Sequence, residues 1–166
     1  MTSHAGTHID APSHVLENAA SIDELPLDIF YGRCRVLDMT ACETAITAAD
    51  LKPHKIHAGE RLLFKTSNSL RGFQRFYDDY VYLDGDAAEY LADCDVLLVG
   101  IDALSIKQKG TTDNTAHEAL LRESIPIIEG LNLRDVSKGE YTLCAFPLSF
   151  SELDGSPTRA LLLTSS

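Results

Sequence analysis

Three of the chain's six histidines lie within eleven residues near its start, together with one carboxylate. These side chains belong to His4, His8, Asp10 and His14. Imidazole and carboxylate groups are ligands that Zn²⁺ and Mn²⁺ accept. Gly6 and Pro12 disfavour a regular helix across the stretch, so we expect a bent loop. In such a loop Asp10 can reach an ion held by His4 and His8, and His14 can lie near that ion without binding it.

A histidine-rich terminus can also be a solvated tail, so histidine content alone leaves two interpretations open. The order of the residues is more specific than their content. The stretch follows the pattern H-x-G-T-H-x-D-x-P-x-H. This pattern resembles the signature of the metal-dependent cyclase family, which includes the bacterial-type kynurenine formamidases and the isatin hydrolases. Later segments resemble the family too, so the resemblance covers nearly the whole chain.

A second pair of candidate ligands lies in residues 96–129, whose pattern predicts a strand, a loop, a helix and another strand. If the two strands are parallel, their carboxyl ends lie on the same edge of the sheet, where α/β proteins usually bind ligands. His117 lies in the first turn of the predicted helix and Glu129 ends the second strand. We therefore expect the two side chains on one edge, although either residue alone could be an ordinary surface residue.

Both positions fall in segments that resemble the cyclase family. Residues 115–121 resemble its S/A-H-x-x-L-L segment, and residues 127–131 resemble its I-x-E-x-L segment. The resemblance implies two ions, Zn²⁺ or Mn²⁺, with Asp10 bridging them. The implied ligands are His4 and His8 on one ion, and His117 and Glu129 on the other. His14 matches the family's catalytic histidine, so the resemblance implies that it is a general acid or base.

The elements that must position these residues indicate an α/β protein with a mixed β-sheet and flanking helices. We predict one domain over residues 1–166. The resemblance implies the swivelling β/β/α-like cyclase fold. Strands are predicted over 34–39, 61–66, 82–83, 96–101, 125–129, 141–148 and 159–164. Short helices are predicted over 47–51, 84–94 and 115–122, and residues 153–157 are predicted to form a turn.

A predicted loop over 67–80 is polar and rich in aromatic residues. Long loops inside compact domains are often functional, so we predict that Phe73, Phe76 and Tyr77 contact the substrate. The resemblance implies a homodimer or a higher homo-oligomer, and this loop could instead pack against another subunit. Asp102 follows the strongest predicted strand. It is expected either to orient a ligand histidine or to cap its own loop.

The composition excludes several classes of partner. The net charge of −11 argues against nucleic acid and against an anionic membrane surface. We see no apolar run that could span a bilayer and no signal peptide. The four cysteines are scattered and form no C-x-x-C pair, which argues against a zinc ribbon. A cytoplasmic protein with reduced thiols is expected.

Together these features predict a metal-dependent hydrolase that cleaves a C–N amide bond in a small molecule. The resemblance implies an aryl formamide such as N-formylkynurenine, or a related cyclic amide, as the substrate. Family members usually carry a further segment before the metal motif, so we expect an early strand to be missing, supplied by a neighbouring subunit, or lost through a wrongly set start of the sequence. The alternative hypothesis is a non-catalytic metal-binding or interaction protein that retains the cyclase fold.

Overall fold

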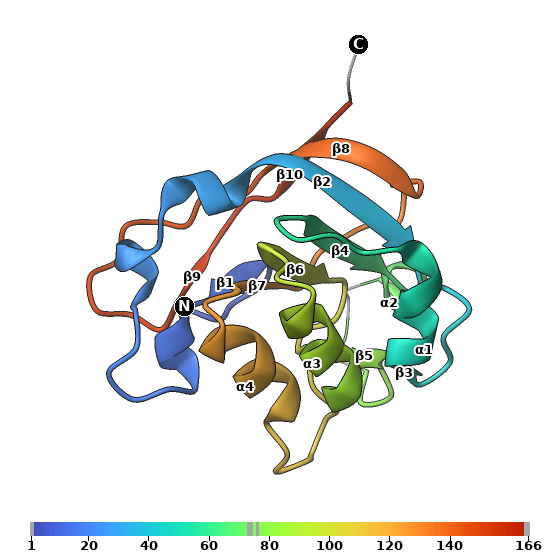
Figure 1. The fold of residues 1–166 in the computed structure, drawn as a ribbon, viewed down its shortest axis with the longest axis horizontal. Coiled ribbons are helices and arrows are strands. Elements are labelled where there is room, and N and C mark those ends of the chain that lie inside the picture. The colour runs from blue at the N-terminus through green and yellow to red at the C-terminus, as the bar shows by residue number, and fades with distance from the viewer. Residues whose placement is uncertain (1, 73–74, 76, 165–166) are drawn as a thin grey trace.

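A long, curled β-sheet forms the centre of the fold (Figure 1). The structure is a computed structural model and describes residues 2–72, 75 and 77–164. Within these residues the sheet has eight strands. In their spatial order they are β10 (Leu161–Leu163), β8 (Gly139–Cys144), β2 (Tyr31–Asp38), β4 (Arg61–Lys65), β6 (Leu98–Ile101), β7 (Ile127–Glu129), β1 (His8–Asp10) and β9 (Gly155–Pro157).

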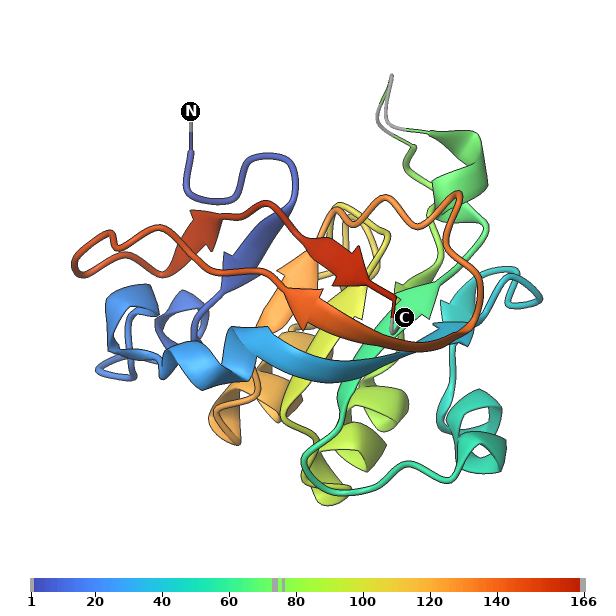
Figure 2. The same ribbon diagram turned by 90° about the horizontal axis from the view of Figure 1, so that it is seen from above.

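The sheet is mixed, as the sequence predicts. Its middle strands β2, β4, β6 and β7 are parallel neighbours. Antiparallel strands extend it on both sides, with β8 and β10 beyond β2, and β1 and β9 beyond β7. The strands curl into a half-barrel, with β2, β8 and β10 arching over the remainder (Figure 1). Figure 2 shows β9 running beside β1, although the two strands lie at opposite ends of the sequence.

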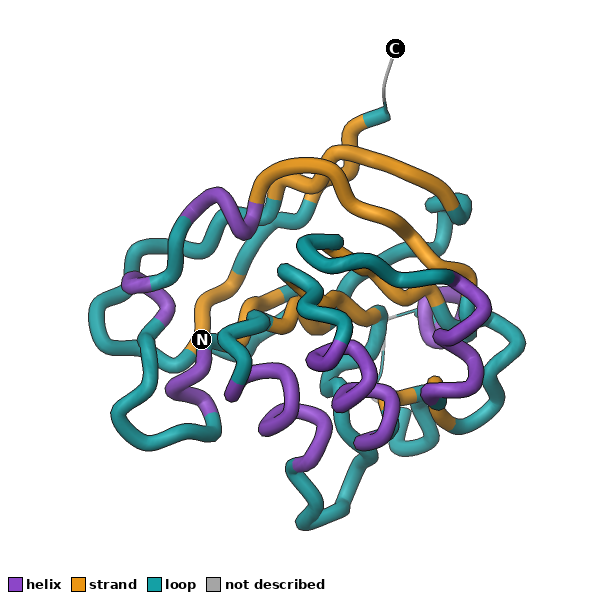
Figure 3. The backbone as a smooth tube through the Cα atoms, viewed as in Figure 1, coloured by secondary structure: helices purple, strands orange, loops and turns teal. Residues whose placement is uncertain are grey.

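Helices cover one side of the parallel strands (Figure 3). The α-helices are α1 (Ala48–Leu51), α2 (Asn68–Arg71), α3 (Gly85–Asp93) and α4 (Thr115–Arg122). The 3₁₀ helices are η1 (Pro12–His14), η2 (Ile22–Glu24), η3 (Leu27–Phe30) and η4 (Lys52–His54). A second, two-stranded sheet pairs β3 (Ala45–Ile46) with β5 (Tyr82–Leu83). No helix in the described part of the chain is long and apolar enough to cross a membrane.

Apolar packing explains why β6 lies in the middle of the sheet. All four of its residues are buried, as expected for a parallel strand that is covered on both faces. One apolar cluster packs β4, β6 and β7 against α3 and α4. A second cluster fills the space under the curled strands β2 and β8. The parallel pairing of β6 with β7 meets the condition on which His117 and Glu129 were expected to share one edge of the sheet.

The predicted helix starts agree with the structure. Thr47 and Asp50 form a reciprocal capping box at α1, and the Asp84 carboxylate caps α3 by accepting two backbone N–H groups. Asn114 occupies the cap position of α4, but its side chain makes no capping bond. The carboxylate of Asp113 instead accepts the N–H of Thr115.

Three sequence predictions were wrong at particular segments. The bent loop predicted for the histidine-rich stretch contains the strand β1, because β7 and β9 supply hydrogen-bonding partners on both sides. The turn predicted at residues 153–157 contains the strand β9 for the same reason. The predicted loop over 67–80 begins with α2. Ser69 in this helix is buried, and its backbone N–H is bonded to Asp102.

Candidate metal centre

The strand β1 places two candidate ligands side by side. Successive side chains of a strand point to opposite faces, so His8 and Asp10 share one face while Ile9 points into the core. Antiparallel pairing sets His8 opposite Glu129 on β7, and sets Asp10 opposite Gly155 on β9. The register of three strands therefore converges on one point of the sheet.

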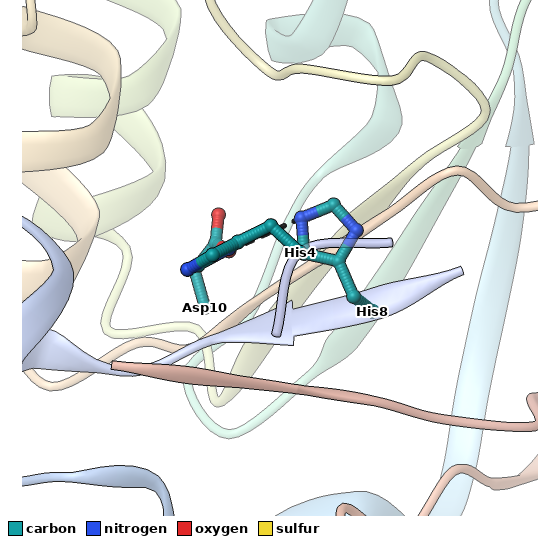
Figure 4. Close-up of side chains that lie close together, drawn as sticks. All are labelled: His4, His8 and Asp10. Atoms are coloured by element: carbon teal, nitrogen blue, oxygen red, sulfur yellow. Dashed lines mark hydrogen bonds and ion pairs between the residues drawn. The ribbon is translucent and has the colours of Figure 1, made fainter. Parts of the chain in front are cut away.

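The turn before β1 brings His4 back over the strand. Gly6 has a φ of +67°, a conformation that glycine adopts without steric cost. Nδ1 of His4 lies 2.8 Å from Oδ1 of Asp10. Figure 4 shows His4, His8 and Asp10 gathered beside β1. The side chains of His8 and Asp10 are almost fully buried, whereas that of His4 is 24% exposed.

The orientation of His8 is fixed by the backbone. Its Nδ1 donates to the carbonyl oxygen of Gly6 at 2.9 Å, so Nε2 is the nitrogen that faces the cluster. Nε2 lies 3.3 Å from Oδ1 of Asp10 and 3.3 Å from Oε2 of Glu129. In metal-binding histidines the nitrogen that does not bind the ion usually donates to a carbonyl, a carboxylate or water, as Nδ1 of His8 does.

His117 and Glu129 lie on the same edge of the sheet, as the strand–helix–strand pattern predicts. Nε2 of His117 is 3.2 Å from Oε1 of Glu129 and 3.6 Å from Oδ2 of Asp10. Oε1 of Glu129 also accepts the backbone N–H of Ile106 at 2.6 Å. Both side chains are about 95% buried, so neither is the surface residue that the sequence alone allowed.

The donor set fits a bound metal ion. Oδ2 of Asp10 is buried and has no hydrogen-bond partner among the described residues, and leaving such an atom unpaired is costly. His4, His8 and Asp10 each offer a ligand atom within 4.8 Å of the others, and so do Asp10, His14 and His117. Asp10 belongs to both groups and uses buried oxygen atoms, so the geometry is compatible with a carboxylate shared between two ions.

The structure adds Asp154, a residue that the sequence interpretation missed. Asp154 directly precedes β9, and its Oδ2 lies 2.9 Å from Nδ1 of His14 and 3.0 Å from Nε2 of His4. Burial alone would raise the pKa of Asp154, but its interactions with the two histidines outweigh this effect and lower the pKa. The D-G-S-P sequence indicated only a turn and gave no local signal for this position.

Interactions within the cluster shift the pKa values of Asp10, His4, His8 and His117. Burial would raise the pKa of Asp10, but interactions with His117, His4 and His8 hold it well below its usual value. Burial opposes the charged forms of His8 and His117. Their interactions with Asp10 and Glu129 nevertheless raise the pKa of His8 to about 10 and that of His117 to about 9. The hydrogen bond with Asp10 also raises the pKa of His4. A metal ion would therefore compete with protons for these candidate ligands.

Asp102 has a structural place outside the cluster. Its fully buried carboxylate accepts the backbone N–H groups of Thr66 and Ser69 and the hydroxyl of Thr66. The structure therefore supports the prediction that Asp102 caps its own loop, rather than the alternative that it orients a ligand histidine.

The aromatic loop is described only in part. Tyr77 donates its hydroxyl hydrogen to the carbonyl of Arg71 at 3.0 Å, and guanidinium groups of Arg71 and Arg75 lie over its ring. Phe73 and Phe76 lie outside the described residues. The interactions of Tyr77 do not test the prediction that Phe73, Phe76 and Tyr77 contact the substrate.

Comparison with known proteins relates this geometry to one family. The Cyclase family model matches residues 1–108. The kynurenine formamidase of Salinibacter ruber (strain DSM 13855 / M31) is 40% identical over 162 residues, which cover 98% of this chain and 76% of that protein. A structure described as a potential metal-dependent hydrolase with cyclase activity superposes with a TM-score of 0.92 at 40% identity, covering 98% of this chain and 79% of the other. An isatin hydrolase bound to the product analogue thioisatinate superposes with a TM-score of 0.84 at 25% identity, covering 100% and 74%.

Proposed function

This chain belongs to the cyclase family, and on that premise we propose that it is a metal-dependent hydrolase that cleaves the C–N bond of an aryl formamide such as N-formylkynurenine. The observation that carries the metal dependence is the buried Asp10, with an unpartnered oxygen among three histidines and a second carboxylate. The substrate class is supported by the 40% identity to a kynurenine formamidase. Cyclic amides are the second class to test, because an isatin hydrolase shares the fold.

We infer that two ions, Zn²⁺ or Mn²⁺, bind per chain. The ligands of the first would be His4, His8 and one oxygen of Asp10. The ligands of the second would be His117, Glu129 and the other oxygen of Asp10. When bound, such ions supply Lewis acidity and a water that is activated near neutral pH.

The chain's own residues prepare this site and serve the leaving group. The Gly6 carbonyl holds the ring of His8, and the N–H of Ile106 holds the carboxylate of Glu129, so these two ligands are oriented before an ion arrives. His14 lies at the edge of the cluster of candidate ligands, with its side chain 30% exposed. We assign it the transfer of a proton to the departing aryl amine as the C–N bond breaks.

The test is turnover of N-formylkynurenine, other aryl formamides and isatin by the protein, first stripped of metal and then reloaded with Zn²⁺ or Mn²⁺. We expect hydrolysis of at least one amide that depends on added metal. His14→Ala should keep its metal and melting temperature while turnover falls by about 10²–10⁴-fold. His57→Ala is the matched control, because this histidine is exposed and belongs to none of the groups that could hold a metal ion.

Two results would contradict the proposal in different ways. A protein that binds metal but hydrolyses no amide would favour the alternative of a non-catalytic metal-binding protein. Loss of metal from His14→Ala would make His14 a ligand, which its distance to Asp10 and His117 permits. The homo-oligomeric state, the cytoplasmic location and the substrate contacts of Phe73, Phe76 and Tyr77 stay predictions.

A further inference from the structure

Asp154 is held beside the metal centre by the backbone on both sides. The N–H of Ala11 donates to the carbonyl of Asp154, and the N–H of Ile22 donates to the carbonyl of Leu153, each at 2.9 Å. The next residue, Gly155, enters β9 and pairs with Asp10. The position of the Asp154 side chain is therefore set by the same strand ladder that positions the candidate ligands.

The ring of His14 contacts Asp154 and lies close to the candidate ligands. Nδ1 of His14 forms a 2.9 Å hydrogen bond with Oδ2 of Asp154. One ring nitrogen of His14 also lies within 4.8 Å of ligand atoms of Asp10 and His117, and the rings of His14 and His117 are 5.5 Å apart between centroids. The ring is therefore bonded to Asp154 and lies close to two of the candidate ligands.

We propose that Asp154 is a positioning residue for His14, which it orients by accepting the hydrogen on Nδ1. This inference rests on the proposed function. A neutral imidazole carries one hydrogen, so placing it on Nδ1 leaves Nε2 as the acceptor that can take up a proton from the site and return it to the leaving amine. A carboxylate that holds a histidine in this way also stabilises the imidazolium formed during the reaction.

His4 is the competing partner of Asp154. Its Nε2 lies 3.0 Å from the same carboxylate oxygen, but this nitrogen has no hydrogen bond of acceptable geometry with any described residue. The other nitrogen of His4 is bonded to Asp10 at 2.8 Å. The contact with His14 is the one with hydrogen-bond geometry, so we assign the orienting role to that pair. If Asp154 served His4 instead, its loss would empty the metal site.

The test compares Asp154→Ala, Asp154→Asn, His14→Ala and the double variant His14→Ala/Asp154→Ala in the metal-loaded protein. We expect Asp154→Ala to lower kcat by about 10–100-fold, with KM, metal content and melting temperature near their original values. Asp154→Asn should lose less, because its amide oxygen can still accept the Nδ1 hydrogen. In the His14→Ala background, Asp154→Ala should cause no further loss, because the two residues act as one unit.

A control and a second measurement make the result decisive. Asp93→Ala removes an exposed carboxylate near the end of α3 and should leave kcat unchanged. Nitrogen-15 spectra of the imidazole rings should show His14 protonated at Nδ1 in the original protein and a mixture of tautomers in Asp154→Ala.

Metal loss from Asp154→Ala, or losses that multiply in the double variant, would overturn the proposal. If the protein hydrolyses no amide, the proposed function is wrong. The tautomer of His14 in the nitrogen-15 spectra would still show whether Asp154 orients the ring.

Discussion

Gly155→Ala should damage the metal centre without altering any ligand. Gly155 lies in β9 opposite Asp10, and its backbone is extended, so alanine fits the local conformation. A β-carbon at this position would lie 2.7 Å from Cε1 of His4 and 2.7 Å from the carbonyl oxygen of Ile9. Because carbon atoms in contact are about 3.5 Å apart, the His4 ring must withdraw by about 0.8 Å. The partial exposure of His4 gives the ring room to move outward.

That displacement is large for a metal ligand. Ligand distances must hold within about 0.2 Å, so His4 would no longer reach an ion held by His8 and Asp10. A misplacement of about 1 Å can cost about 100-fold in rate, and we expect turnover to fall by about this factor. The free energy of unfolding of the metal-free protein should fall by about 1–3 kcal/mol from overpacking. Elemental analysis, amide turnover and denaturant titration measure the three effects.

Gly100→Ala is the matched control for overpacking. Its β-carbon would lie 2.5 Å from a methyl carbon of Leu63 and 2.9 Å from one of Leu131, in the core rather than at the ligands. We expect it to destabilise the fold while the folded protein keeps its metal. If Gly155→Ala binds metal and turns over substrate normally, the strands relax around the new methyl group. The argument that β9 fixes the position of His4 would then be refuted.

Three further outcomes follow from the same contacts. Asp10→Ala should lose most of its bound metal, because one carboxylate serves both proposed ions, and unchanged metal in elemental analysis would remove the bridging role. Zn²⁺ binding at pH 7.5 should release about two protons, because the raised pKa values leave His8 and His117 protonated in the metal-free protein. Metal affinity should therefore rise with pH towards 9, and calorimetry showing no dependence on the buffer's ionisation enthalpy would contradict this. Asp102→Asn should lower the free energy of unfolding by about 1–3 kcal/mol, because its amide nitrogen is a donor and cannot replace a carboxylate oxygen that accepts a buried hydrogen bond, and a denaturant titration checks this.

The sequence predicted the parts of the fold that have a strong local pattern. The apolar run ending at Ile101 predicts a central strand that is covered on both faces, and Asp84 marks the start of α3, because burial on both faces and helix capping leave local signatures. The same topology predicts that His117 and Glu129 meet on one edge. Residue spacing could not predict β1, because a strand of three residues is too short for an alternating pattern.

The neighbourhood of Asp154 could not be predicted because it depends on pairing across most of the chain. Gly155, Ser156 and Pro157 are typical turn residues, and that local preference predicts a turn. The structure instead has an edge strand, where proline is tolerated because its missing N–H need not face a neighbour. The long-range pairing of β9 with β1 brings Asp154 to His14, which lies 140 positions earlier in the sequence.

The register of β1 connects the stability of the fold to the proposed chemistry. Ile9 is fully buried in the apolar cluster, and its two neighbours in the strand carry the candidate ligands. A shift of the strand by one residue would put Ile9 at the site and both polar side chains in the core, at a cost of several kcal/mol for the buried charges. Packing of Ile9 therefore selects the one register in which His8 faces Glu129. Because β9 pairs with the other side of β1, the same register also sets the distance between Gly155 and His4. The core and the metal centre are thus two faces of one three-residue strand, and a perturbation of either face should be felt at the other.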